Sequence, residues 1–214
     1  MIWPTRFTKS MVERYMAEGL WTEETMVSRL RRLGKERGGA VAASDARRRL
    51  TWAELDSESY RVGRSLRDIG LQRGELVLVQ LPNWVENLLV RYALKRAGLL
   101  GVYVPVVWRE AELERVVRSS GARAIVAPAR FLGADFHEMF QRMRAKFPNL
   151  QRGIFVRGDV ARSAATFCWE ELAATRGPGN DLEAFEPWEV SLISVSSGST
   201  GAPKLCEWPE AAHW

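Results

Sequence analysis

The sequence has little of the chemistry that marks metal sites or secreted scaffolds, since its 214 residues contain only two cysteines and two histidines. Cys168 and Cys206 lie far apart and show the paired spacing of neither a zinc site nor a disulfide framework. A reducing, cytoplasmic location is therefore expected. His137 falls in an amphipathic segment, where a surface or packing role is favoured over catalysis.

Long apolar runs are also missing from the sequence. The first ten residues lack the continuous apolar core of a signal peptide, and no stretch approaches the roughly 20 apolar residues that cross a bilayer. We therefore expect no membrane span. The composition, with 46% hydrophobic and 27% charged residues, lies in the range of globular proteins and allows a packed core.

No concentrated basic tract accompanies the formal net charge of +5. The densest basic cluster lies between Arg29 and Arg37, and clusters of this kind can contact nucleic acid or anionic membranes. Nucleic-acid binders interleave aromatic residues with such charges, and this cluster has none. The pattern favours a solvated helix face, and no nucleic-acid partner is expected.

Strand-like and helix-like patterns alternate along most of the chain. Strands are predicted over residues 40–43, 49–51, 76–81, 99–107, 122–127, 153–156 and 190–195, and helices over residues 10–18, 22–35, 52–69, 84–97, 110–120, 131–147 and 169–175. Such alternation is typical of βαβ units. The predicted fold class is α/β, with a largely parallel sheet flanked by helices.

Several helix ends carry their own signals. Thr51 followed by Glu54 forms a capping box for the helix over 52–69, and Gly70 is its expected terminator. Thr22 is the predicted N-cap of the helix over 22–35. The two helical patterns before residue 38 predict a helical lead-in over residues 1–38.

The last predicted strand runs into a loop in which nearly every residue is small or carries a hydroxyl. The loop residues are Ser196, Ser197, Gly198, Ser199, Thr200, Gly201, Ala202, Pro203 and Lys204. Glycines let the backbone approach a bulky anion, hydroxyls donate hydrogen bonds to phosphate oxygens, and the lysine adds a positive charge. The loop thus indicates a polyphosphate site, with a ligand-free surface turn as the alternative.

This loop differs from the common P-loop, in which a Gly-Lys pair precedes Ser or Thr, because Pro203 precedes Lys204 and Leu205 follows it. Its order of residues resembles the signature of the adenylate-forming superfamily, which includes acyl-CoA synthetases, aryl-acid AMP ligases and luciferases. The segments at 50–55, 70–75, 81–83, 95–98 and 104–105 are similar to further landmarks of that superfamily. The segment 13–21 is similar to the opening of aryl-acid AMP ligases, although its aromatic residues also suit simple packing.

The resemblance implies an ATP-dependent ligase that joins an aryl or fatty acid to AMP and releases pyrophosphate. Coenzyme A or an acyl carrier protein would then accept the acyl group. The loop from Ser196 to Lys204 is implied to hold the β- and γ-phosphates, with Mg²⁺ neutralising phosphate oxygens. Ser197, Ser199 and Thr200 would donate hydrogen bonds, Gly198 and Gly201 would allow close approach, and Lys204 would balance charge.

The chain also departs from the family pattern. Glu210 stands where the family has a histidine, His213 is out of register, and no catalytic residue is assigned. Nothing matches the family's adenine-contacting segment, ribose-binding aspartate, metal-binding glutamate or C-terminal lysine. We therefore expect residues 39–214 to form a partial AMP-binding domain without the C-terminal lid domain, inactive alone and poorly soluble.

Two alternatives stay open. The chain could be a non-catalytic phosphate-binding or interaction protein of the same fold, which pairs with a separately encoded remainder of the ligase. It could also be another doubly wound nucleotide-binding enzyme, but such enzymes carry a GxGxxG turn after an early strand, and the sequence has none.

Overall fold

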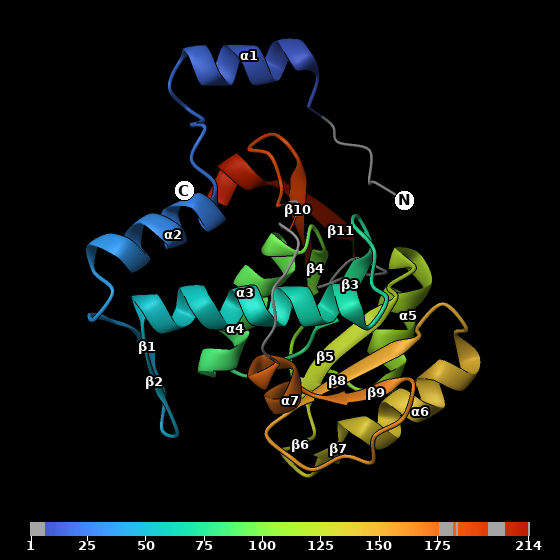
Figure 1. The fold of residues 1–214 in the computed structure, drawn as a ribbon. Coiled ribbons are helices and arrows are strands. Elements are labelled where there is room, and N and C mark those ends of the chain that lie inside the picture. Colours follow the sequence, from blue (N-terminus) through green and yellow to red (C-terminus); the bar gives the residue numbers. More distant parts are fainter. Residues whose placement is uncertain (1–6, 176–181, 183, 197–203, 214) are drawn as a thin grey trace.

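The computed structural model describes residues 7–175, 182, 184–196 and 204–213. Within these residues a seven-stranded sheet forms the centre, in the order β11-β10-β4-β3-β5-β8-β9 (Figure 1). Its strands are β3 (Leu76–Val79), β4 (Leu100–Tyr103), β5 (Ala124–Pro128), β8 (Arg152–Val156), β9 (Thr166–Cys168), β10 (Val190–Val195) and β11 (Leu205–Pro209). All neighbouring pairs are parallel except β10 and β11, which are antiparallel.

Helices cover both faces of this sheet. α3 (Trp52–Asp68), α4 (Val85–Arg96) and α7 (Trp169–Ala174) pack on one face, and α5 (Glu110–Ser120) and α6 (Phe136–Lys146) pack on the other. Because successive strand side chains point to opposite faces, Val77 and Val79 of β3 join the first core while Leu76 and Leu78 join the second. The predicted α/β fold with a largely parallel, helix-flanked sheet is confirmed.

The N-terminal helices differ in how they meet this body. α2 (Met26–Glu36) packs on α3 and α4 and buries Val27 and Leu30. α1 (Lys9–Ala17) buries no residue and stands apart at the top of Figure 1. A hairpin of β1 (Val41–Ser44) and β2 (Arg49–Thr51) then leads into α3.

The capping signals were partly correct. The predicted box at Thr51 is confirmed, since the Thr51 N–H donates to Glu54 Oε2 at 2.8 Å and the Glu54 N–H donates to Thr51 Oγ1 at 3.3 Å. The prediction of Thr22 as the N-cap of the second helix is wrong, because Thr25 caps α2. Thr25 has a reciprocal partner three residues on, Ser28, which donates its N–H to Thr25 Oγ1 at 3.1 Å.

Several strands and helices differ from the prediction. The helix predicted from residue 131 begins at Phe136, because the hairpin of β6 (Arg130–Phe131) and β7 (Ala134–Asp135) precedes it and Asp135 caps it. β4 ends before Pro105, which has no N–H to donate to a ladder. β9 and β11 were not predicted, and both are short strands at the two edges of the sheet.

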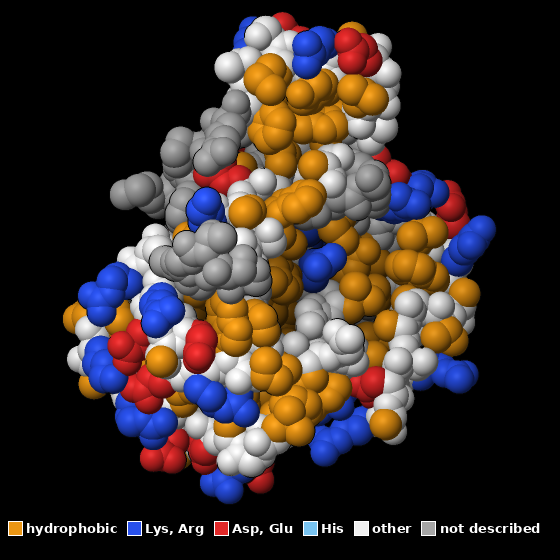
Figure 2. All heavy atoms as spheres, turned by 180° about the vertical axis from the view of Figure 1, so that it is seen from behind, with side chains coloured by type: hydrophobic (Ala, Val, Ile, Leu, Met, Phe, Trp, Pro, Cys, Tyr) orange, Lys and Arg blue, Asp and Glu red, His pale blue; other side chains and the backbone are white. Residues whose placement is uncertain are grey.

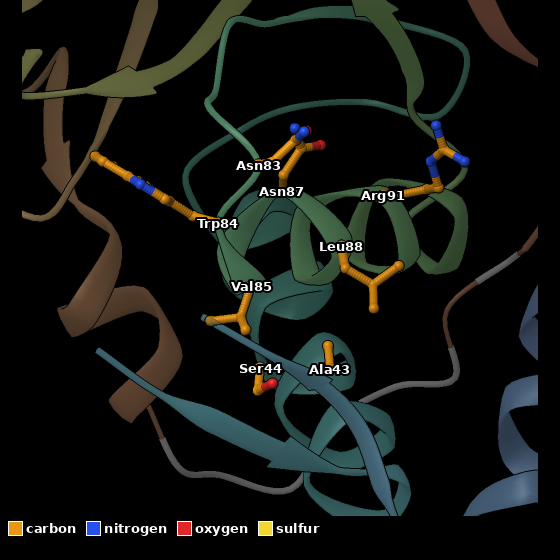
Figure 3. Close-up of a pocket in the computed structure, with 8 residues that line it drawn as sticks. All are labelled: Ala43, Ser44, Asn83, Trp84, Val85, Asn87, Leu88 and Arg91. Atoms are coloured by element: carbon orange, nitrogen blue, oxygen red, sulfur yellow. The ribbon is translucent and has the colours of Figure 1, made fainter. Parts of the chain in front are cut away.

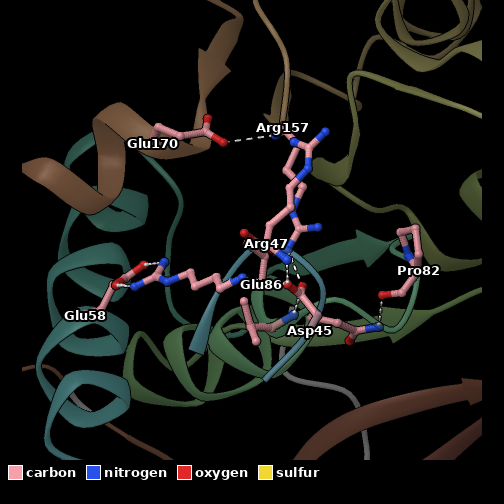
Figure 4. Close-up of polar contacts among 10 residues, drawn as sticks. Asp45, Arg47, Glu58, Pro82, Glu86, Arg157 and Glu170 are labelled. Atoms are coloured by element: carbon pink, nitrogen blue, oxygen red, sulfur yellow. Dashed lines mark hydrogen bonds and ion pairs between the residues drawn. The ribbon is translucent and has the colours of Figure 1, made fainter. Parts of the chain in front are cut away.

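A buried ionic network ties the β1–β2 hairpin to the sheet (Figure 4). The Arg157 guanidinium, at the carboxyl end of β8, contacts Asp45 of the hairpin turn and lies 2.7 Å from Glu86 of α4. It also lies over the Trp84 ring, 4.2 Å from the centroid, and its backbone N–H donates to Glu170 of α7 at 2.9 Å. One residue at the end of β8 thus joins the hairpin and α4 through its side chain and α7 through its backbone.

Asp45 is the most strongly stabilised carboxylate of this network. Burial opposes its ionisation, but hydrogen bonds from the backbone N–H groups of Arg47 and Val85 and from Arg157 outweigh burial and hold the pKa of Asp45 well below its usual range. A carboxyl group with a depressed pKa stabilises the folded state above its unfolded pKa of about 3.9, and this contribution is lost as the pH falls.

We expect Asp45→Asn to lower the free energy of unfolding by about 1–3 kcal/mol at pH 7, since it removes charge-assisted hydrogen bonds. Urea unfolding followed between pH 7 and pH 3 measures this, and the variant's stability should fall less steeply with acid than that of the parent. Asp159→Asn, at an exposed carboxyl nearby, is the control. Equal pH slopes for the parent and Asp45→Asn would contradict the assignment.

Candidate phosphate site

The loop predicted to bind phosphate joins β10 to β11, and the structure describes both ends of it. The Ser196 N–H donates to the Lys204 carbonyl at 3.0 Å, and the Lys204 N–H donates to Ser196 Oγ at 2.9 Å. These two bonds close the hairpin at a defined neck, and Lys204 is exposed there. The other predicted phosphate-site residues, Ser197, Gly198, Ser199, Thr200 and Gly201, lie outside the described residues.

The neck lies at the carboxyl edge of the parallel sheet. β10 runs parallel to β4, with Ser194 opposite Tyr103, so the two strands end at the same edge. Open α/β sheets bind their ligands outside the carboxyl ends of their strands. Ser196 and Lys204 therefore stand where this fold class places a ligand, although the sequence motif alone carried no information about the neck.

A groove that sequence reasoning missed lies at the same edge, where β3 leads into α4 (Figure 3). Its volume is about 340 Å³, and it is lined by Ala43, Ser44, Asn83, Trp84, Val85, Asn87, Leu88 and Arg91. Asn83, just before α4, and Asn87 and Arg91 of α4 are spaced four residues apart and lie on the same side in Figure 3. This spacing of polar residues in an apolar helix was the available signal.

Arg91 connects this groove to β4, the strand that lies beside β10. Its guanidinium carbon lies 5.2 Å from the centre of the Tyr103 ring, and Tyr103 is the residue of β4 that stands opposite Ser194 of β10. Burial raises the pKa of Tyr103 to about 12, so the ring stays neutral beneath the cation at physiological pH. The cation of Arg91 thus lies over a ring of β4 at the position opposite Ser194 of β10.

Glu210, which the sequence resemblance aligns with a histidine, lies at the far end of the hairpin from the loop. Its side chain is only 1% exposed and faces Lys95 of α4. Glu210 is therefore part of the protein interior, and the histidine's role does not pass to it. For His213, the structure describes the backbone at the end of the 3₁₀ turn η1 (Glu210–His213).

Two exposed tryptophans lie at the hairpin, Trp188 just before β10 and Trp208 on β11. Trp188 and Trp208 are 46% and 43% exposed, and the Trp208 Nε1–H donates to Ser194 Oγ at 2.8 Å. Seen from behind, hydrophobic side chains gather along the middle of the molecule below α1 (Figure 2). Exposed apolar surface of this kind is typical of interaction faces and of poor solubility.

Among the described residues, no group of three or more His, Cys, Asp or Glu side chains could hold a metal ion. In the same part of the chain, no helix combines the length and the apolar character that a bilayer crossing requires.

Comparison with known proteins gives consistent matches. The model of the AMP-binding enzyme family matches residues 30–212. Salicyl-AMP ligase / salicyl-S-ArCP synthetase of Mycobacterium tuberculosis is 31% identical over 204 residues, which cover 93% of this chain and 35% of that protein. The 2,3-dihydroxybenzoate-AMP ligase of Bacillus subtilis is 28% identical over 201 residues, with coverages of 94% and 36%.

Solved structures agree with the sequence matches. The apo structure of Mycobacterium smegmatis MbtA superimposes with a TM-score of 0.85 at 30% identity and covers 98% of this chain and 38% of that one. The chain thus spans little more than a third of the length of the relatives that it matches.

Ser196 offers a direct test of the neck. We expect Ser196→Ala to remove the acceptor of the Lys204 N–H and to speed hydrogen exchange of that amide about fivefold, which corresponds to one hydrogen bond of about 1 kcal/mol. Exchange measured by NMR or mass spectrometry checks this. The control is Ser194→Ala, which removes the bond to Trp208 but leaves the neck intact. Unchanged exchange in Ser196→Ala would contradict the neck geometry.

Proposed function

Because this chain belongs to the AMP-binding enzyme family, we propose that it is the phosphate-binding part of an ATP-dependent ligase that converts a carboxylic acid to an acyl-adenylate. One observation carries the proposal: the neck of the β10–β11 hairpin presents Lys204 beside Ser196 at the carboxyl edge of the sheet. The family resemblance inferred from the loop is confirmed by the family match and the relatives.

The described residues suit a phosphate group. Lys204 is exposed and carries a full charge, and the Ser196 hydroxyl, which accepts one bond from the Lys204 N–H, can still donate one to a phosphate oxygen. We propose that Ser197, Gly198, Ser199, Thr200 and Gly201 complete the cradle. ATP would be the ligand, and Mg²⁺ bound with it would neutralise phosphate charge. No metal ligand is assigned to this chain.

We further propose an aryl acid as the substrate, with fatty acids second. The names of the two relatives with the matches described above specify salicylate and 2,3-dihydroxybenzoate. Coenzyme A or an acyl carrier protein is proposed as the acceptor of the acyl group, since one of these relatives is also a salicyl-S-ArCP synthetase. We propose a lead-in over 1–38 and a partial adenylation domain over 39–214; α1, which buries no residue, supports a separate lead-in, whereas α2 packs on α3 and α4 and buries Leu30.

A non-catalytic phosphate-binding protein is the second candidate. The observation that favours it is Glu210, which replaces the family's histidine and turns inward to Lys95. On this proposal the hairpin binds a polyphosphate, and a separately encoded remainder of the ligase or another partner covers the exposed apolar face. Adenylation chemistry separates the two candidates, whereas phosphate binding is common to both.

We expect Lys204→Ala to weaken binding of pyrophosphate and of MgATP about 10- to 100-fold, since a charge-assisted hydrogen bond contributes about 1.5–3 kcal/mol. Isothermal titration calorimetry on the full chain measures both ligands. Lys35→Ala, which removes an exposed cation from α2, is the matched control for net charge. Equal weakening in both variants would show that the net charge of the protein attracts these ligands, and it would contradict the assignment of Lys204 to a phosphate site.

Adenylation is tested by ATP–pyrophosphate exchange with a panel of aryl and fatty acids. We expect no exchange with this chain alone, because phosphate contacts leave the base, the ribose and the carboxylate without partners. Exchange should appear when the chain is fused to the remainder of a related ligase, and salicylate-like acids should be the best substrates. Exchange by the chain alone would contradict the need for further segments. Phosphate binding without exchange in the fusion would favour the second candidate.

A further inference from the structure

β11 carries only a weak signal for its own register. Leu205 and Glu207 are half-buried, Cys206 and Trp208 are exposed, and Pro209 is buried, so β11 has no fully buried face. Register is strongly specified where one face of a strand is buried and weakly specified elsewhere. The ladder with β10 also contains a bulge between Val190 and Leu192. Backbone pairing alone therefore leaves room for a shifted register.

A buried cluster of Lys95, Ser191 and Glu210, called here the Lys95 cluster, lies at the end of this ladder. Glu210 Oε2 accepts hydrogen bonds from Lys95 Nζ and from Ser191 Oγ, the latter at 2.5 Å, and Lys95 Nζ also donates to Ser191 Oγ at 2.6 Å. Glu210 Oε1 accepts from the Met26 N–H at 2.8 Å. The three residues come from α4, from β10 and from the turn after β11, and Met26 begins α2.

The cluster is almost completely buried, since the side chains of Lys95 and Glu210 are 2% and 1% exposed. Burial lowers the pKa of Lys95, and the Glu210 carboxylate opposes that shift. Burial alone would raise the pKa of Glu210, but the Lys95 charge and the hydrogen bonds from Ser191 and Met26 hold it below its usual value. The two side chains thus form a buried ion pair in which each is the partner of the other.

A buried ion pair of this kind adds little net stability over a well-packed apolar pair, whereas removal of one partner costs about 3–5 kcal/mol. A slip of two residues is the smallest that keeps side chains on their own faces, and it moves a strand by about 7 Å. Such a slip would carry Glu210 away from Lys95 and leave a buried charge unpaired. The cluster therefore penalises a shifted register.

We propose that the Lys95 cluster sets the register of β11 against β10, which makes Lys95 and Glu210 positioning residues for the neck of the phosphate loop. The register that pairs Val195 with Leu205 is the one that brings Lys204 opposite Ser196. A slipped strand would present a different residue to Ser196. The consequence for phosphate binding rests on the proposed function, whereas the register itself does not.

A cross-strand disulfide measures the register directly. Because Ser196 and Lys204 form a bonded pair, Val195 and Leu205 form the neighbouring non-bonded pair, whose Cα atoms stand about 4.5 Å apart in antiparallel ladders. That spacing suits a disulfide. The parent for the test is Val195→Cys/Leu205→Cys with Cys168→Ser and Cys206→Ser, and thiol trapping followed by mass spectrometry gives the rate of cross-linking.

Glu210→Gln should slow cross-linking at least about tenfold, since it leaves the Lys95 charge unpaired. The deciding variant is Lys95→Met/Glu210→Met, which should recover the urea midpoint of the parent, because apolar pairs replace buried ion pairs without loss of stability. It should still cross-link slowly, because methionines do not distinguish registers. Recovery of both stability and the parent's cross-linking rate would overturn the proposal.

Two further outcomes are informative. A parent that fails to cross-link would show that β10 and β11 do not pair in this register, and the proposal would fall with it. Pyrophosphate titration of the same variants separates the register from the proposed function. If the parent cross-links but binds no pyrophosphate, the role of the Lys95 cluster in setting the register stands, and its consequence for the phosphate site is contradicted.

Discussion

The parallel ladder between β4 and β10 is the interaction on which the candidate site depends. It pairs Leu192 with Gly101 and Ser194 with Tyr103, and it thereby places the end of β10 at the carboxyl edge of the sheet. Gly101 is needed in this ladder, because a Cβ atom there would lie 2.6 Å from the Tyr103 ring. The ring in turn supports Arg91. Packing between two strands thus fixes both the neck of the loop and the half-buried Tyr103 ring.

Ion pairs at both ends of α4 join segments that are far apart in the sequence. At its first turn Glu86 meets Arg157 of the β8 end, and near its last turn Lys95 meets Glu210 after β11. Buried pairs of this kind contribute more to the choice of one arrangement than to net stability. The hydrophobic cores hold the layers together, and the ion pairs decide how the hairpins at the margins of the sheet are seated.

Local signals explain which parts of the fold could be predicted. The helix over 110–120 and the strand over 190–195 were predicted with their observed bounds, because a helical period marks the first and a largely apolar run, interrupted by Ser191 and Ser194, marks the second. β9 and β11 were not predicted. Each is an edge strand with a neighbour on one side only and few buried residues, so its sequence shows no long apolar run. The Lys95–Glu210 pair could not be predicted, since its partners are 115 residues apart and each alone is typical of a solvated surface.

The hairpin that carries the loop is constrained at its two ends by different physics. At the outer end Ser196 and Lys204 close the neck, where the proposed phosphate ligand limits the choice of residues. At the inner end Glu210 is limited by charge balance with Lys95 in the protein interior. Between them Cys206 is exposed, and Trp208 is held only by the hydrogen bond from its Nε1–H to Ser194 Oγ on the neighbouring strand and by other surface contacts. On the proposed function, a change after the loop alters phosphate binding without contact with phosphate, because it acts through the register of one edge strand.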